Sequence, residues 1–70
     1  MTDRVSNNIY SLRKKEGITQ QEFADFIGVT RQTIIALEKG NYTTSVALAI
    51  RIAEYFKQPV EKVFILKNNK

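Results

Sequence analysis

Residues 20–37, QQEFADFIGVTRQTIIAL, constrain the fold most, because their pattern predicts two short helices joined by a tight turn. Thr19 and Glu22 form a capping-box pattern, in which the Thr19 hydroxyl accepts a hydrogen bond from a free amide and the Glu22 carboxylate bonds back. Gly28 follows the apolar stripe of the first helix and suits the left-handed conformation of a helix C-cap. Thr30 offers a second N-cap two residues later. A connection this short makes the two helices cross steeply.

The remaining pattern adds further short helices around this pair. Ala24 is expected at the closest approach of the crossing helices, since that place needs a small side chain. Caps, glycines and Pro59 predict helices over about residues 8–16, 20–27, 31–39, 46–56 and 60–63. Residues 1–7 fit either a frayed end or a short edge strand. Whether such an edge strand pairs with a strand at residues 64–66 is left open. The expected fold class is all-α, a bundle of four to five short helices. A short two-stranded sheet that joins the termini is compatible with this fold and is left undecided.

Composition narrows the class of protein. The 70 residues are expected to form one domain near the lower limit for an unaided hydrophobic core, so self-association is expected as well. The chain has no cysteine and no histidine, which argues against a disulfide framework and a zinc site and favours a cytoplasmic location. No apolar run reaches the roughly 18 residues that a membrane crossing needs. The net charge of +4 and the pI near 9.6 suit a polyanionic partner, although the same charges also suit a protein that is merely soluble.

The predicted helix at residues 31–39 has an unusual outward side. At about 100° per residue, Ile34 and Leu37 share one side. The opposite side carries Arg31, Gln32, Ile35, Ala36 and Lys39. The helix dipole disfavours a cation in the first turn by about 0.3–1 kcal/mol, so stability does not explain Arg31. Arginine and glutamine match guanine and adenine edges in the DNA major groove, and small apolar groups meet the thymine methyl. The alternative is that the polar side chains are merely solvated and that Ile35 packs under a neighbouring loop.

A resemblance to a known family rests on these residues. Its most specific positions are Thr19-Gln20, Ala24, Gly28-Val29, Thr30-Arg31-Gln32-Thr33-Ile34 and Glu38-Lys39-Gly40. From about Asn8 to Phe64, the chain resembles the Cro/cI-type (XRE) helix-turn-helix family of phage and bacterial repressors. It is most similar to the short single-domain members that end soon after a fifth helix. The resemblance implies a lambda-repressor-like bundle, with one helix-turn-helix DNA-binding domain over residues 1–70 and the motif at about residues 20–39.

The resemblance also implies which residues contact double-stranded DNA. Together with the outward position of Ile35, it assigns the base edges to Arg31, Gln32, Ile35 and Ala36. It assigns the sugar-phosphate backbone to Gln20, Thr33, Lys39, Asn41, Tyr42 and Thr43, of which Thr33 also fits a base edge. Arg13 and Glu38 match a pair that bridges two helices, and they are expected to form a structural ion pair. Two departures weaken the match: Ala36 offers only a methyl contact, and Thr43-Thr44 replaces the Asn-Pro or similar pair that often follows the tyrosine.

Two classes of function follow. The resemblance implies a sequence-specific transcriptional regulator, expected to be a repressor that binds an inverted-repeat operator as a homodimer. The alternative is an antitoxin or another protein-interaction module that uses the same fold, although no long tail is present with which to wrap a toxin. The carboxylates never pair at a spacing that suggests acid–base work, so no enzyme is expected. No cofactor, metal, membrane or small-molecule partner is expected either.

An apolar cluster near the C-terminus predicts the homodimer interface. After the first four helices close their core, the chain still carries Val60, Val63, Phe64, Ile65 and Leu66. Little chain is left to cover these side chains, and exposed apolar patches of this kind mark interfaces. In the family that the chain resembles, short repressors pair in this region about a two-fold axis. These five residues are therefore the expected interface.

Overall fold

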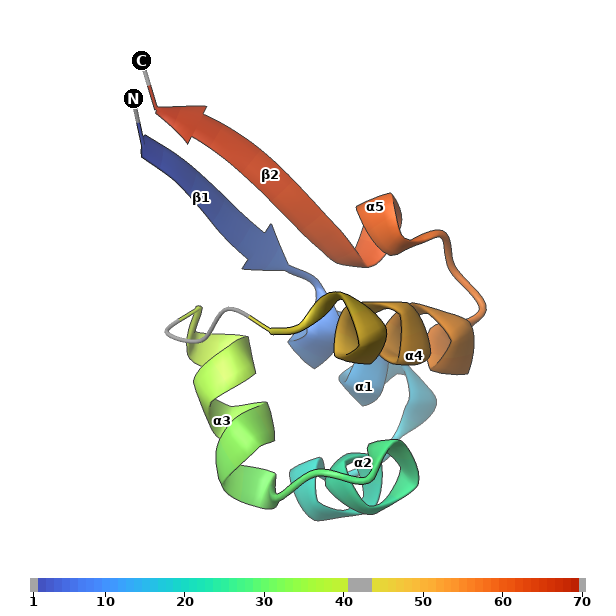
Figure 1. The fold of residues 1–70 in the computed structure, drawn as a ribbon. Helices are drawn as coiled ribbons and strands as arrows, with labels where there is room; N and C mark the ends of the chain where they lie inside the picture. Colours follow the sequence, from blue (N-terminus) through green and yellow to red (C-terminus); the bar gives the residue numbers. More distant parts are fainter. Residues whose placement is uncertain (1, 41–43, 70) are drawn as a thin grey trace.

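The computed structural model describes residues 2–40 and 44–69, which form five short helices and a two-stranded sheet (Figure 1). In chain order the elements are β1 (Thr2–Asn7), α1 (Ile9–Glu16), α2 (Gln20–Ile27), α3 (Arg31–Lys39), α4 (Val46–Phe56), α5 (Val60–Val63) and β2 (Phe64–Asn69). The fold class expected from the sequence is confirmed, and the sheet that the sequence left open is present. Asn41, Tyr42 and Thr43, which are expected backbone contacts, lie outside the described residues. Within the described ranges, no helix is long and apolar enough to cross a membrane.

Local hydrogen bonds set the helix ends where the sequence predicts them. The capping box of α2 is complete: the Glu22 amide donates to Thr19 Oγ1 at 3.0 Å, and the Thr19 amide donates to Glu22 Oε1 at 2.8 Å. Thr30 and Ser45 accept in the same way from amides in the first turns of α3 and α4. Gly28 ends α2 with a φ of 87°, the left-handed conformation that glycine adopts without steric cost. The connection from α2 to α3 is therefore short and fixed at both ends.

The hydrophobic core lies where the helices meet. Its buried apolar residues are Ile9, Phe23, Ala24, Ile27, Ile34, Leu37, Leu48, Ile52, Ala53, Phe56 and Val63. Phe23 stacks on Phe56 with ring centroids 5.1 Å apart and meets Tyr55 in an edge arrangement at 5.4 Å, so α2 is fastened to α4 by aromatic contacts. Ala24 is fully buried, as expected for the small residue of the pair of crossing helices. The packing fixes α2 and α3 relative to the rest of the bundle.

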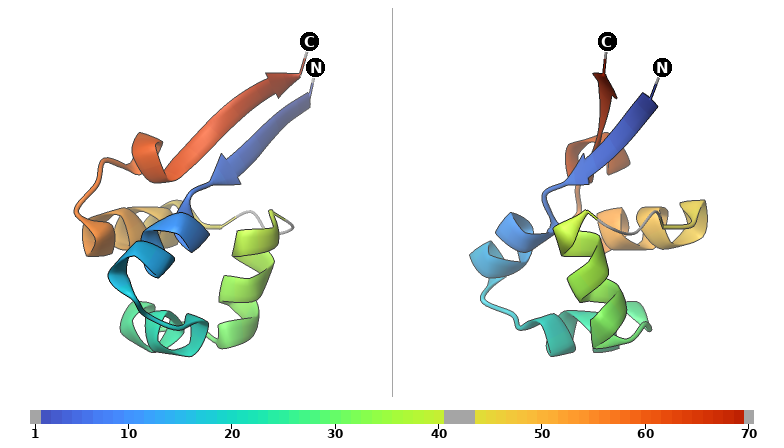
Figure 2. Two further views of the ribbon diagram at one scale, coloured as in Figure 1. Left: turned by 180° about the vertical axis from the view of Figure 1, so that it is seen from behind. Right: turned by 90° about the vertical axis from the view of Figure 1, so that its left-hand side faces the viewer.

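The two-stranded ribbon projects away from the helical body, as Figures 1 and 2 show from three directions. The strands β1 and β2 are antiparallel, and Val5 lies opposite Leu66. At the base of the ribbon, the Asn7 side-chain amide donates to the carbonyl of Leu37 at 2.8 Å. This hydrogen bond ties the end of β1 to the last turn of α3, so the ribbon has a fixed origin on the helical body.

The structure corrects part of the expected homodimer interface. Val63 is fully buried, because α5 directs its side chain into the core beside the start of α1, where the Asn8 amide donates to the Val63 carbonyl at 2.9 Å. Phe64 is half-buried against the same core. The prediction that the chain leaves both residues uncovered is therefore wrong for Val63 and holds only in part for Phe64. The members of the cluster that stay exposed are Val60, Ile65 and Leu66.

An ion pair inside the bundle joins α1 to α3. Arg13 donates from Nε to Glu38 Oε2 at 2.7 Å and from Nη2 to Glu38 Oε1 at 3.1 Å, which is a bidentate arrangement. The two side chains are only 7% and 8% exposed, and Arg13 Nη1 also donates to the carbonyl of Ile18 at 3.0 Å. The hydrogen bond to Glu38 raises the pKa of Arg13 above its ordinary value, although burial opposes this change. Loss of the proton from the Arg13 guanidinium is therefore disfavoured in this contact.

We predict that Glu38→Gln lowers the free energy of unfolding by about 3 kcal/mol, because it leaves the Arg13 guanidinium inside the bundle without its counter-charge. Urea denaturation followed by circular dichroism, at one protein concentration for all variants, measures this loss. The double variant Arg13→Met/Glu38→Leu should recover most of it, since an apolar pair of similar volume needs no counter-charge.

The matched control for this prediction is Glu54→Gln. Glu54 is exposed on α4, so its substitution should change the free energy of unfolding by less than about 0.5 kcal/mol. A Glu38→Gln variant that is as stable as the Glu54→Gln variant would show that the ion pair does not hold α1 against α3.

Candidate nucleic-acid interface

Helix α3 presents two sides of different character. Ile34 and Leu37 are 0% and 1% exposed and belong to the core. The other side carries the exposed Arg31, Gln32 and Lys39 and the half-buried Ile35 and Ala36. Because the buried side fixes the rotation of the helix about its axis, the polar side chains of its first turn face away from the bundle. An arginine and a glutamine thus begin the outward side, a lysine ends it, and small apolar groups lie between them.

Thr33 is placed differently from the outward residues of α3. It is half-buried, its amide donates to Thr30 Oγ1 at 3.3 Å, and the two hydroxyl oxygens lie 3.1 Å apart. A hydroxyl has one proton to donate and two acceptor sites. If Thr30 donates to Thr33, the Thr33 proton remains available for a phosphate oxygen. The cap of α3 is therefore compatible with a backbone contact from Thr33 in one of the two hydroxyl orientations.

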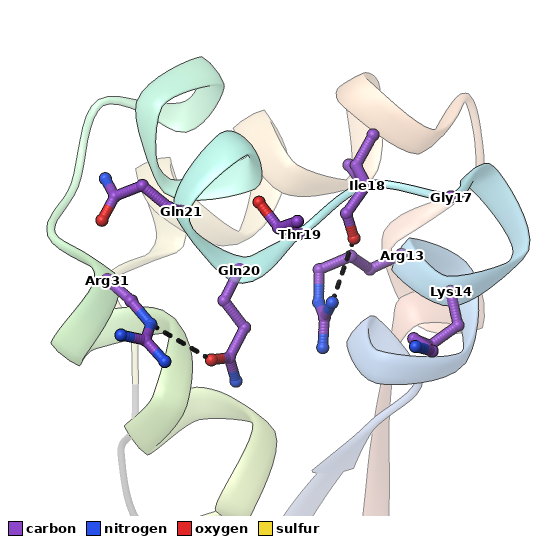
Figure 3. A pocket seen from close by; sticks show the side chains of 8 residues that line it. All are labelled: Arg13, Lys14, Gly17, Ile18, Thr19, Gln20, Gln21 and Arg31. Carbon is purple, nitrogen blue, oxygen red and sulfur yellow. Dashed lines mark hydrogen bonds between the residues drawn. The ribbon is translucent and has the colours of Figure 1, made fainter.

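A depression of about 490 Å³ lies beside the beginning of α3 (Figure 3). It is lined by Arg13, Lys14, Gly17, Ile18, Thr19, Gln20, Gln21 and Arg31, from the end of α1 and the starts of α2 and α3. Every charged side chain in this lining is a cation. Since Glu38 neutralises Arg13, the positive potential at the rim comes from Lys14 and Arg31. A site lined in this way attracts anions.

Lys14 is a cation of this lining for which the sequence predicted no contact with DNA. It belongs to the run Arg13-Lys14-Lys15, and such a run at a helix C-terminus is ordinarily a solvated helix end that is favoured by the helix dipole. Its Nζ lies 5.9 Å from the centroid of the Tyr10 ring, and Arg13 Cζ lies 5.3 Å from the same centroid. No local pattern places Lys14 near Arg31, because only the packing of α1 beside α2 and α3 brings them to one depression.

Hydrogen bonds connect this depression to the buried ion pair. Gln20 Nε2 donates to Glu38 Oε1 at 3.2 Å, and Arg31 Nε donates to Gln20 Oε1 at 3.4 Å. The bonded residues are 18 and 11 positions apart in the chain, so neither contact follows from helical spacing. Gln20, expected to meet a phosphate, is thus also a neighbour of the arginine expected to meet a base.

Comparisons with known proteins agree with this geometry. A family model described as Helix-turn-helix matches residues 9–63. An HTH-type transcriptional regulator of Methanothermobacter thermautotrophicus is 56% identical over 55 residues, which cover 77% of this chain and 80% of that protein. A competence pilus inhibition repressor of Acinetobacter baylyi is 40% identical over 65 residues, which cover 93% of this chain and 59% of that protein. The transcriptional regulator VanUg has a similar fold in its crystal structure, with a TM-score of 0.77 at 23% identity over 99% of this chain and 92% of that chain.

The family match covers the motif and most of the surrounding helices. The matched proteins are transcriptional regulators and not enzymes, and the residues that the family model matches include α2 and α3. The resemblance noted from the sequence is thereby confirmed. The chain belongs to the XRE-type helix-turn-helix family of DNA-binding transcriptional regulators.

Proposed function

We propose that this protein is a cytoplasmic transcriptional repressor that binds an inverted-repeat operator as a homodimer. The observation that carries the proposal is the outward side of α3, where Arg31 and Gln32 are exposed while Ile34 and Leu37 hold the helix to the core. The name of the Acinetobacter baylyi relative, a competence pilus inhibition repressor, supports repression as the direction of control. Occupation of a site close to a promoter would keep RNA polymerase from it.

Base recognition is assigned to the outward residues of α3. Recognition helices of this kind contact base edges mainly with their N-terminal residues, and Arg31 and Gln32 open α3. Arginine pairs bidentately with guanine O6 and N7, and glutamine pairs with adenine N6 and N7. Ile35 and Ala36, one turn further along, offer apolar groups to thymine methyls. These four residues would read part of each half-site.

Contacts to the sugar-phosphate backbone would fix the register of α3 in the groove. Among the described residues, they are assigned to Gln20, Thr33 and Lys39. Lys39 is exposed at the end of α3, and Gln20 opens α2 at the rim of the cationic depression. Asn41, Tyr42 and Thr43 remain predictions from the sequence. These residues would strengthen binding to every duplex but would not distinguish one base sequence from another.

The homodimer would form through the exposed part of the C-terminal apolar cluster. Val60 is 38% exposed, Ile65 is 37% exposed and Leu66 is 64% exposed. The half-buried Phe64 would contribute its outer edge. A two-fold axis near these residues would set the two copies of α3 about 34 Å apart, which is one turn of DNA. Symmetry of the protein would then match the symmetry of an inverted repeat.

The first prediction of this proposal concerns salt. A dimer that makes about 6–10 phosphate contacts should lose about a thousandfold or more in affinity for an inverted-repeat duplex between about 50 and 200 mM salt, because binding releases condensed counterions. Selection from a random duplex pool identifies the site, and fluorescence anisotropy at several salt concentrations measures the slope. Failure to enrich any duplex, or an affinity that hardly responds to salt, would reject the proposal.

The second prediction separates base recognition from backbone contact. Arg31→Ala or Gln32→Ala should weaken the cognate site by about 1–3 kcal/mol and relax the preference at one base pair of each half-site. Lys39→Ala should instead weaken cognate and random duplexes by about the same factor, since a phosphate contact carries no sequence information. Anisotropy titrations on the cognate site, on single base-pair variants and on random DNA give these comparisons. Equal losses on cognate and random DNA for Arg31→Ala would show that Arg31 does not read a base.

The third prediction concerns the dimer. Leu66→Asp should give a monomer by light scattering at tens of micromolar, with operator affinity falling in parallel, because it places a charge in the proposed apolar interface. Val46→Asp is the control, since Val46 is 76% exposed on α4 and lies outside that interface. Val63→Asp is not a test of the interface, because a charge at this buried position should unfold the chain itself. A dimeric Leu66→Asp variant with full operator affinity would refute this interface.

A further inference from the structure

The side chain of Asn7 joins the base of the ribbon to two helices. Asn7 is the last residue of β1 and lies opposite Phe64, the first residue of β2. Its Nδ2 donates to the carbonyl of Leu37 at 2.8 Å, across 30 positions of the chain. Its Oδ1 accepts from the amide of Ile9 at 3.2 Å, at the start of α1. One half-buried carboxamide therefore holds together the end of β1, the beginning of α1 and the last turn of α3.

The two contacts fix the orientation of this carboxamide. A backbone amide only donates and a backbone carbonyl only accepts, so Asn7 must present Oδ1 to Ile9 and Nδ2 to Leu37. The Leu37 carbonyl lies in the last turn of α3, where carbonyls have no amide of a following turn as a partner. It also accepts from the amide of Gly40 at 3.0 Å, so both of its lone pairs are used. The Asn7 side chain thus completes the hydrogen bonding of this carbonyl at the end of α3.

The ribbon carries exposed apolar residues through which the proposed dimer would form. Ile65 and Leu66 directly follow Phe64, which is paired with Asn7. At about 3.3 Å per residue, Leu66 is about 7 Å along the ribbon from this pair. Figure 1 shows the ribbon extending away from the helices, so contacts at its base set its direction. The hydrogen bond of Asn7 is one of these contacts, and it is made to the helix that is proposed to enter the groove.

The spacing of half-sites depends on where each protomer holds α3 relative to the dimer axis. Half-sites one turn of DNA apart lie about 34 Å and about 10 base pairs from each other, so one base pair corresponds to about 3.4 Å. In a symmetric dimer each protomer accounts for half of this distance, about 1.7 Å. A dimer therefore selects one spacing only if each protomer holds α3 relative to its interface within about this distance.

We infer that Asn7 is a positioning residue for half-site spacing, because its hydrogen bond to Leu37 holds α3 at a fixed place relative to the ribbon. The inference rests on the proposed function, in which two copies of the chain pair through α5 and the ribbon on an inverted repeat. With the bond in place, the two copies of α3 fit half-sites of one separation. A site one base pair longer or shorter is bound only when the bond breaks in both protomers. Asn7 thus affects the choice of spacing and not the choice of base.

The neighbouring Asn8 provides a matched control. Its Nδ2 donates to the carbonyl of Lys62 at 2.9 Å, so it also joins the start of α1 to a distant helix, but that helix is α5 and not α3. Asn7→Ser removes the donor to Leu37 and keeps a side-chain oxygen that can accept from the first amide of α1. Asn8→Ser removes the contact with Lys62, while the backbone bond from its amide to the Val63 carbonyl remains. Circular dichroism verifies that both variants are folded.

The first test measures the preference for spacing. The operator selected by the wild-type protein is synthesised with one base pair inserted at its centre or removed from it, and anisotropy titrations measure the affinity for each duplex. Asn7→Ser should reduce the preference for the selected spacing by about tenfold, because the other spacings no longer break a hydrogen bond in each protomer. Its base preferences within the half-site should stay unchanged. Asn8→Ser should keep the wild-type preference for spacing and for bases.

A merely structural role of Asn7 would give a different result. It would weaken binding to all three duplexes by one factor and leave the preference for spacing as it is. That result, or an equal loss of the preference in Asn8→Ser, would overturn the inference while the proposed function stands. A wild-type protein that selects no inverted repeat would instead reject the proposed function, and the role in spacing with it.

The second test needs no DNA. Residual dipolar couplings of the backbone amides compare the orientation of the ribbon with that of the helices in the free protein. In the wild type and in Asn8→Ser, β1, β2 and α1 to α4 should fit one alignment tensor. In Asn7→Ser, the couplings of the ribbon should become smaller than this tensor requires, because the ribbon moves against the helices. A ribbon that stays as well aligned in Asn7→Ser as in the wild type would refute the anchor, whatever the protein binds.

Discussion

The burial of Ile34 and Leu37 is the constraint on which the rest of the structure depends. These two side chains hold one side of the nine-residue helix α3 in the core. The opposite stripe carries the exposed Arg31, Gln32 and Lys39 and the half-buried Ile35 and Ala36. Arg31 on that stripe is a poor choice for stability, because its charge opposes the helix dipole in the first turn. A role in binding explains the exposed arginine on this stripe, which packing does not explain.

The ion pair between Arg13 and Glu38 links this surface to the stability of the bundle. It occupies the space between α1 and α3 with a charge on each side, and each charge satisfies the other. An ion pair of low exposure is weak evidence for added stability, since an apolar pair of similar volume often serves as well. In this chain Glu38 has a further partner in Gln20, which reaches Arg31. An apolar pair in the same place would offer no hydrogen bond to Gln20.

In the C-terminal part of the chain, the number of apolar residues overestimates how many of them are exposed. A count of apolar residues leaves five of them after the first four helices, and the structure removes one of the five, because α5 turns Val63 back into the core. The ribbon of β1 and β2 then carries the exposed Leu66 out beside Val5, away from the helices. The exposed part of the C-terminal apolar cluster is therefore smaller than the sequence indicates, and it lies on α5 and the ribbon.

The sequence by itself determined the helices, their caps and the two sides of α3. Local hydrogen bonds and helical periodicity act over a few residues, so Thr19, Gly28 and Thr30 mark the ends of α2 and α3 without any knowledge of the fold. The tertiary structure alone decided the contacts between residues far apart in the chain. The bond from Gln20 to Glu38, the nearness of Lys14 to Arg31, and the burial of Val63 all depend on the angles at which helices pack. Those angles are set by the shapes of many side chains in the core together, and no short stretch of sequence records them.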